Sequence, residues 1–163
     1  MRHGATATLK RTAVLVLALW LAGAGGASAC QVPGARNAAQ TEIIARTNAY
    51  RKASRRAAVI HSQALAAAAQ KQACDMAAAG AISHTGADGS SVSQRVSSEG
   101  YAWRFVAENV AAGYPTGAAV FAGWKGSRGH RANMLNRRAD EIGIGWATAG
   151  GKNYWVMVLA APR

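Results

Sequence analysis

The end of the chain places the strongest constraint on its fold. Residues 141–147 and 153–160 flank the dipeptide Gly150-Gly151. The large apolar side chains of the first segment recur at every second position: Ile142, Ile144 and Trp146. An apolar period of two indicates a β-strand, and a glycine pair between two such segments supplies the positive φ angles of a tight turn. The sequence therefore predicts a C-terminal antiparallel hairpin.

The segments before the hairpin are mostly helical in pattern. Residues 37–53 and 62–79 have apolar residues at helical spacing, and Gly80 stands where the second helix should end. Two shorter helices are expected, one capped by Ser90 or Ser91 and ending at Gly100, the other over residues 116–125, while residues 105–112 fit a strand or a buried extended segment. Because helices come first and paired strands last, we expect an α+β domain with a mainly antiparallel sheet.

The first 29 residues have the three parts of a secretory signal peptide. A basic start precedes an apolar run at residues 13–22, and small residues follow up to Ala27-Ser28-Ala29. A run of about ten residues is too short for a membrane-spanning helix, which needs roughly 20. We therefore expect residues 1–29 to be removed, residues 30–163 to form one exported domain in the periplasm or the medium, and no transmembrane anchor to remain.

Two interpretations of Cys30 are open, because it directly follows the predicted cleavage site. It could form a disulfide with Cys74, the only other cysteine, which would stabilise the domain by about 4 kcal/mol on the chain-entropy model. It could instead be the acylated cysteine of a lipoprotein, although Ala27 stands where such signals usually carry leucine. A lipidated Cys30 would leave Cys74 as a free thiol in an oxidising compartment, so the disulfide is favoured.

The chain is strongly basic. It has 19 Lys and Arg against seven Asp and Glu, and removal of residues 1–29 would leave 16 basic residues and a formal charge of +9. An exported domain of this charge is attracted to anionic phospholipids, lipopolysaccharide or acidic wall polymers, whereas nucleic acid is not an expected partner in that compartment. The basic residues are scattered along the sequence, which indicates a generally positive, solvated surface.

Three side chains are candidates for a polar site. His84 lies in a turn-rich segment, His130 follows a glycine in a predicted loop, and Glu108 lies in an apolar segment where a carboxylate needs a partner. If they converge, two imidazoles and a carboxylate could bind zinc with a water as fourth ligand, or a His–Glu pair could act as a general base. The context of Ser127 does not match a nucleophile elbow.

Five short motifs occur in a fixed order with characteristic gaps: Asn48-x-x-Arg51, Ser83-His84-Thr85, Ala107-Glu108-Asn109-Val110, Trp124-x-x-Ser127-x-x-His130 and Glu141-Ile142-Gly143-Ile144-Gly145. This succession resembles the CAP superfamily of cysteine-rich secretory proteins, antigen 5 and pathogenesis-related proteins, and most closely its bacterial, SCP-like branch. The resemblance runs from about Glu42 to Ala160. In that branch a proline commonly stands where this chain has Arg128.

The resemblance implies a three-layer α-β-α sandwich and a cleft lined by two histidines and two glutamates, which binds divalent metal in some members. His84, Glu108 and His130 match three of these positions. The second family glutamate falls at Ser127, so the set is incomplete here, and Glu141 is a candidate substitute. The other matching residues are expected to support the fold by packing and hydrogen bonding, with the glycines marking a bulge or a close approach: Asn48, Arg51, Trp124, Gly143 and Gly145.

Two functional hypotheses follow from this resemblance and from the candidate residues. The favoured one is a non-enzymatic, exported binding domain whose cleft takes an envelope-derived or amphipathic ligand, with a possible weak zinc or other divalent metal site. The alternative is a peptidase-like hydrolase in which Glu108, with His84 or His130, activates water. The oligomeric state is not indicated by any of these features.

Overall fold

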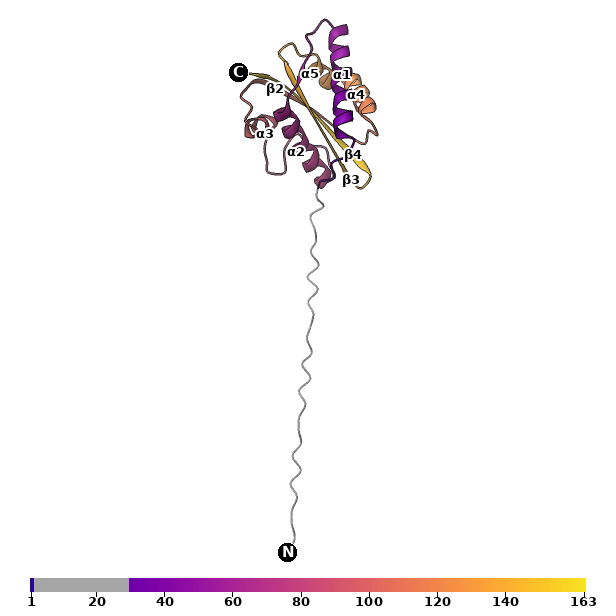
Figure 1. Cartoon of the computed structure of the whole chain (residues 1–163), viewed down its shortest axis with the longest axis vertical. Helices are drawn as coiled ribbons and strands as arrows, with labels where there is room; N and C mark the ends of the chain where they lie inside the picture. Colours follow the sequence, from indigo (N-terminus) through magenta and orange to yellow (C-terminus); the bar gives the residue numbers. More distant parts are fainter. Residues whose placement is uncertain (2–29) are drawn as a thin grey trace.

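The computed structural model describes Met1 and residues 30–163. Residues 30–163 form a sheet that is covered by helices on both faces (Figure 1). The predicted signal peptide lies outside the described residues. The elements are α1 (Arg36–Ala53), β1 (Ile60–His61), α2 (Gln63–Ala79), α3 (Val92–Ser98), β2 (Trp103–Ala112), α4 (Gly117–Gly126), α5 (Arg128–Met134), β3 (Glu141–Ala149) and β4 (Lys152–Pro162).

The sheet is built around the C-terminal hairpin, as the sequence predicts. Its strand order is β1-β3-β4-β2, and all pairs are antiparallel except the short β1–β3 pair. Ala149 pairs with Lys152 across the turn, where Gly150 and Gly151 have φ angles of 54° and 74°. Positive φ at both turn positions matches the right-handed twist of the strands, which explains the glycine pair.

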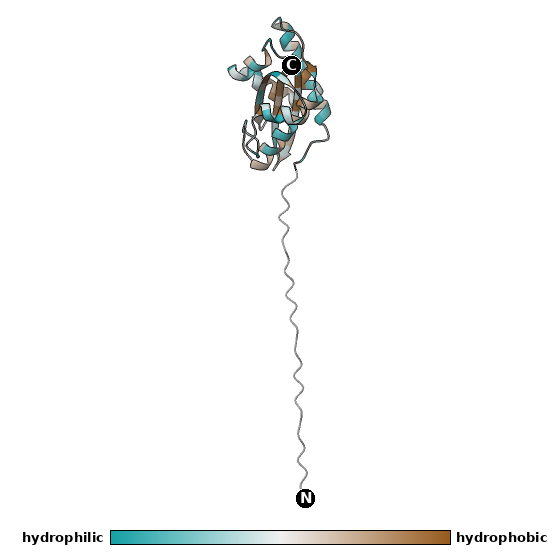
Figure 2. Ribbon diagram, turned by 90° about the vertical axis from the view of Figure 1, so that its left-hand side faces the viewer, coloured by the Kyte–Doolittle hydropathy of each residue, from teal (hydrophilic) through white to brown (hydrophobic). Residues whose placement is uncertain are grey.

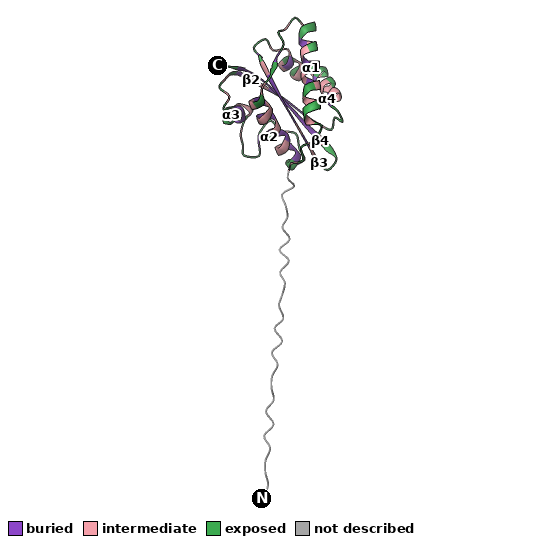
Figure 3. Cartoon of the chain, viewed as in Figure 1, coloured by how far each residue is buried: buried purple, intermediate pink, exposed green. Residues whose placement is uncertain are grey.

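Strand β4 divides the core into two parts, because its side chains alternate between the two faces of the sheet. Trp155, Met157 and Leu159 belong to one cluster with residues of α1, α4 and α5, while Val156 and Val158 belong to the other with residues of α2 and α3. Strands β3 and β4 are accordingly mostly hydrophobic and buried, whereas the outer faces of the helices are polar and exposed (Figures 2 and 3). The α-β-α sandwich is confirmed.

Helix α2 lies unusually close to strand β3. A Cβ atom on Gly143 would lie 2.2 Å from the backbone nitrogen of Ala66, and one on Gly145 would lie 2.3 Å from the carbonyl oxygen of Ala69. The strand register runs without a bulge through both glycines, so they serve a close approach of helix to sheet.

Two elements were not predicted. Strand β1 has only two residues, and α5 occupies the segment where we expected a loop carrying His130. That expectation was wrong: Gly129 suggested an irregular segment, but it occupies the second position of a short helix whose end is anchored in the core by the fully buried Met134. Tertiary packing here outweighs the low helix propensity of glycine.

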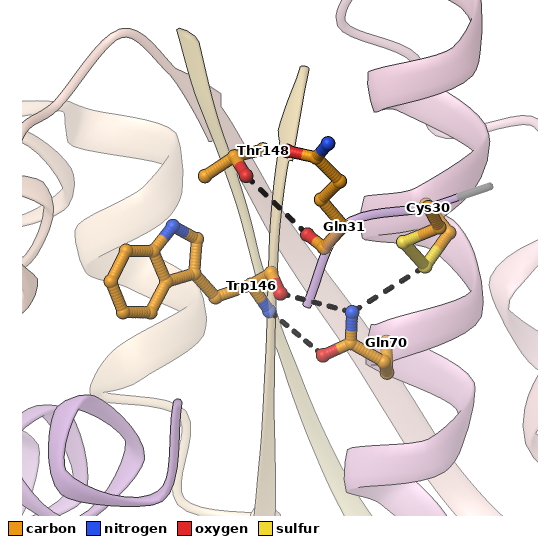
Figure 4. Close-up of a disulfide and its surroundings, with 6 residues drawn as sticks. Cys30, Gln31, Gln70, Trp146 and Thr148 are labelled. Atoms are coloured by element: carbon orange, nitrogen blue, oxygen red, sulfur yellow. Dashed lines mark hydrogen bonds between the residues drawn. A yellow bond between two sulfur atoms is a disulfide. The ribbon is translucent and has the colours of Figure 1, made fainter. Parts of the chain in front are cut away.

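Cys30 is joined to Cys74 in α2 by a disulfide (Figure 4). The adjoining backbone extends the sheet, because the carbonyl of Gln31 accepts a hydrogen bond of 2.9 Å from the Thr148 backbone nitrogen. Between these two contacts, the Gln70 side chain of α2 hydrogen-bonds to both the backbone nitrogen and the backbone carbonyl oxygen of Trp146 in β3, as an adjacent strand would. The start of the domain is thereby attached to the edge of β3.

The residues expected to support the fold do so. Arg51 is fully buried and donates hydrogen bonds to the carbonyl oxygens of Ala57, Met134, Asn136 and Ala139. Asn48 bonds to both backbone groups of Val59, and Trp124 is buried against β2, with its indole donating to Val110. These contacts hold α1 and α4 to the sheet and to the loop before β3.

None of the helices within residues 30–163 is long and apolar enough to span a bilayer.

Candidate functional site

Glu108 lies near the middle of β2, the edge strand where the two helical layers meet. Helix α3 packs on this strand from one layer and α5 from the other. The Glu108 side chain is only 2% exposed, so its charge must be compensated within the protein. Both of its carboxylate oxygens are bonded: Oε2 accepts from Arg95 Nη2 at 2.7 Å, and Oε1 accepts from His84 Nδ1 at 2.8 Å.

Arg95 is the buried partner of Glu108. Its side chain is fully buried, and it also donates to the carbonyl oxygens of Ser90 and His84. Helix α3 holds it in place, because Ser91 and Gln94 form a capping box that sets where the helix begins. A guanidinium that bridges a carboxylate and a loop in this way fixes both relative to the sheet.

His84 is the exposed end of this arrangement. Its side chain is 62% exposed, although Nδ1 is bonded to Glu108. Because an ionised carboxylate can only accept, Nδ1 is the donor in this bond, and Nε2 is the ring nitrogen that is not engaged by Glu108. The loop is held by the buried Gln72 of α2, whose amide donates to the carbonyl oxygens of Ser83 and Thr85. The orientation of the imidazole is therefore set from two sides.

His130 approaches the same place from α5. Burial lowers its pKa below the ordinary 6.5, and the proximity of His84 lowers that pKa further. Asn109 donates to the His130 carbonyl, and Asn133 donates to the carbonyl of Glu108 and to the Asn109 side chain. This amide network couples α5 to the edge strand, so the two histidines approach β2 from opposite layers and are near enough for the charge of one to affect the other.

The sequence profile of the cysteine-rich secretory protein family, CAP, matches residues 44–159. This match covers well over half of the chain. The chain belongs to the CAP family. The chain is 27% identical over 118 residues to the uncharacterised protein YkwD of Bacillus subtilis, a match that covers 72% of this chain but 46% of YkwD.

Solved CAP structures have the same fold. An extracellular protein containing an SCP domain, from Bacillus anthracis, superposes with a TM-score of 0.70 at 24% identity, over 76% of this chain and 40% of that protein. An outer surface protein of Borrelia burgdorferi has a TM-score of 0.70 at 19% identity, over 76% of this chain and 92% of its own. At these identities the similarity establishes the fold, and the function must be argued from the site.

The two remaining candidate site residues of this CAP domain, Ser127 and Glu141, lie on different elements of the fold. Ser127 is the residue between α4 and α5, at the N-cap of α5, and its side chain makes no capping bond. Glu141 begins β3, and its carboxylate lies near Tyr101, whose pKa is raised by burial and by that negative charge. Within the described part of the chain, Glu141 makes no hydrogen bond to His84, Glu108 or His130.

A divalent metal, which the CAP family implies, fits these residues poorly. No group of three or more His, Cys, Asp or Glu within residues 30–163 is arranged to hold a metal ion. Glu108 has both oxygens occupied, and Ser127 supplies a hydroxyl where the family pattern has a carboxylate. Two imidazoles remain, which is fewer than the three protein ligands of an ordinary open zinc site.

Sequence reasoning missed Arg95, although a signal for it exists. Arg95 is three residues after Val92 and adjacent to Val96, so helical periodicity places it on the buried side of its helix. A buried arginine needs hydrogen-bond acceptors within the protein, and Glu108 had been singled out as a buried carboxylate in need of a partner. Asn133 and Gln72 carry no such signal, because their roles depend on the backbone of distant segments.

Proposed function

We propose that this CAP domain is a non-enzymatic binding module, with a cleft formed over β2 by His84, Glu108 and His130. The observation that supports it is the full use of the Glu108 carboxylate by Arg95 and His84. The carboxylate then serves to orient His84, whose Nε2 edge faces solvent as a recognition group. A positive domain with two imidazoles at its cleft favours a ligand with an anionic or hydrogen-bonding head group, such as an envelope-derived amphiphile.

The hydrolase alternative is less well supported by this geometry. To act as the general base, Glu108 would need a carboxylate oxygen that can reach a water and take its proton. Both oxygens of Glu108 are bonded within the protein, and its side chain is 2% exposed. His84 could still accept a proton at Nε2, so the alternative is included in the test below.

We also propose that the domain acts outside the cytoplasm after removal of residues 1–29. The apolar run and the Ala27-Ser28-Ala29 site support export, and the Cys30–Cys74 disulfide suits an oxidising compartment. The Bacillus anthracis protein of similar fold is described as extracellular. Acylation of Cys30 would need the same sulfur atom as the disulfide, so we favour a domain without a lipid anchor.

The test uses untagged domain, residues 30–163, and lysophosphatidylglycerol below its critical micelle concentration as an anionic, amphipathic probe. Binding is measured by calorimetry and by shifts of the histidine ring resonances. The His84→Ala/His130→Ala variant should bind at least tenfold more weakly, while its melting temperature changes little. His61→Ala is the matched control, because His61 is an exposed histidine on β1, outside the cleft.

Two outcomes would count against the proposal. Equal binding by the wild type and the double variant would show that the cleft does not take such a ligand. Release of fatty acid from the probe, abolished by Glu108→Gln, would instead support the hydrolase.

A further inference from the structure

One end of the domain carries a group of basic side chains that are far apart in the sequence. The end comprises the last turn of α1, the loop that follows it and the loop between α5 and β3. We call it the basic end and define it by five residues: Lys52, Arg55, Arg56, Arg137 and Arg138. Residues from two separate segments of the sequence are therefore grouped on one surface of the fold.

The grouping is a direct result of the fold. Buried Arg51 donates to Ala57 in one loop and to Asn136 and Ala139 in the other, and Arg56 donates to Leu135. These bonds hold the two loops side by side. Arg137 and Arg138 lie between the bonded carbonyls of the second loop and are exposed.

No ion pair within residues 30–163 accounts for these charges, although Arg56 donates to Leu135 and the Arg138 guanidinium lies 4.5 Å from the centre of the Phe105 ring. The salt bridges formed by Lys and Arg within residues 30–163 use Arg46, Lys71, Arg95 and Arg104, so all five residues of the basic end are without an acidic partner. Asp140, the neighbouring acid, is already paired with Arg104. Burial and the nearby charge of Arg56 both lower the pKa of Arg51, as expected where cations crowd together.

Arg55 adds a second indication. It has a φ angle of 55°, and it alone among the described residues other than glycine has a positive φ. The position follows the end of α1, where glycine is usually found because a side chain is strained there. An exposed arginine at a strained position is unfavourable for folding, which is typical of residues retained for function.

The shape and surroundings of the basic end favour a flat partner. The end of α1 and the loops that carry the five residues lie at one end of the domain (Figure 1). The disulfide and the β3–β4 turn lie at the other end. Ile60, which is 66% exposed, lies beside the second loop, because its backbone nitrogen bonds to the carbonyl of Asp140. An array of phosphates could meet the cations together, and a bilayer also offers a non-polar region for Ile60.

We propose that the basic end docks the domain onto the surface of an anionic phospholipid bilayer. This surface is separate from the cleft over β2, so the proposal goes beyond the proposed function. Each lysine or arginine near an anionic surface strengthens binding roughly fivefold, so the five together can hold a small domain on a membrane.

The experiment measures sedimentation of the domain, residues 30–163, with vesicles containing phosphatidylglycerol and phosphatidylcholine, at low salt. Arg55→Gln/Arg137→Gln should weaken binding by roughly 25-fold, given about fivefold for each cation. The matched control is Arg36→Gln/Lys152→Gln, which removes the same charge at the start of α1 and at the hairpin turn and should change binding less than threefold. Neutral phosphatidylcholine vesicles should not bind, and 0.5 M salt should release the protein.

The outcomes separate the docking proposal from the alternatives. Equal losses in the two charge variants would mean that net charge alone drives binding, and would overturn it. Binding to soluble polyphosphate through the same residues, without binding to vesicles, would assign the basic end to a polymer and also overturn it. The His84→Ala/His130→Ala variant should bind vesicles normally, so failure of the cleft hypothesis would leave this result unaffected.

Discussion

Replacing Arg95 by methionine should destabilise the domain by about 3–5 kcal/mol, the usual cost of breaking a buried ion pair from one side. Glu108, with a side chain 2% exposed, would be left with His84 as its single side-chain partner. The carbonyl of Ser90 would also lose a donor at 2.7 Å. Since the free energy of unfolding of most domains is only about 5–15 kcal/mol, this one substitution should remove a large part of it.

Urea denaturation followed by circular dichroism measures this effect. With a slope of about 2 kcal/mol per molar urea, the midpoint should fall by roughly 2 M. The Arg95→Met/Glu108→Leu double variant should be more stable than Arg95→Met alone, because it buries no unpaired charge. A cost below about 1 kcal/mol for Arg95→Met, or additive costs in the double variant, would refute the reasoning.

Three further predictions concern the packing, the disulfide and the cleft. Gly143→Ala should lower the free energy of unfolding by about 3 kcal/mol in urea denaturation, because the new methyl group would lie 2.2 Å from the backbone of α2. Gly126→Ala, with open space around it, is the control and should lower that free energy by under about 1 kcal/mol. Similar losses in the two variants would contradict the close approach. Replacing both Cys30 and Cys74 by serine should cost about 4 kcal/mol, and an unchanged melting temperature would show that the bond does not constrain the chain. Because the pKa of His130 is lowered in the folded state, the unfolded chain binds the proton more readily, and the stability present above pH 6.5 is lost as the pH falls. His130→Gln should therefore show a smaller drop in melting temperature than the wild type between pH 8 and pH 5. An equal drop in the two proteins would contradict this.

The parts of the fold that the sequence determined by itself are those specified by neighbouring residues. The hairpin around Gly150-Gly151, the two long helices and the end of α2 at Gly80 follow from local periodicity and turn chemistry, and the structure has all of them. The order of helices before paired strands was enough to predict an α+β domain. The motif succession, through its resemblance to a known family, added the sandwich and nominated His84, Glu108 and His130.

Only the tertiary structure decided how distant segments meet. It placed Arg95 against Glu108, made a helix of the segment around His130, and joined the loop of Arg55 to the loop of Arg137 through the bonds of a buried arginine. Each of these depends on backbone groups and side chains that are 13 to 85 residues apart in the chain. Local periodicity carries no information about such pairs, because it reports which face of one element is apolar and not which distant segment that element will contact.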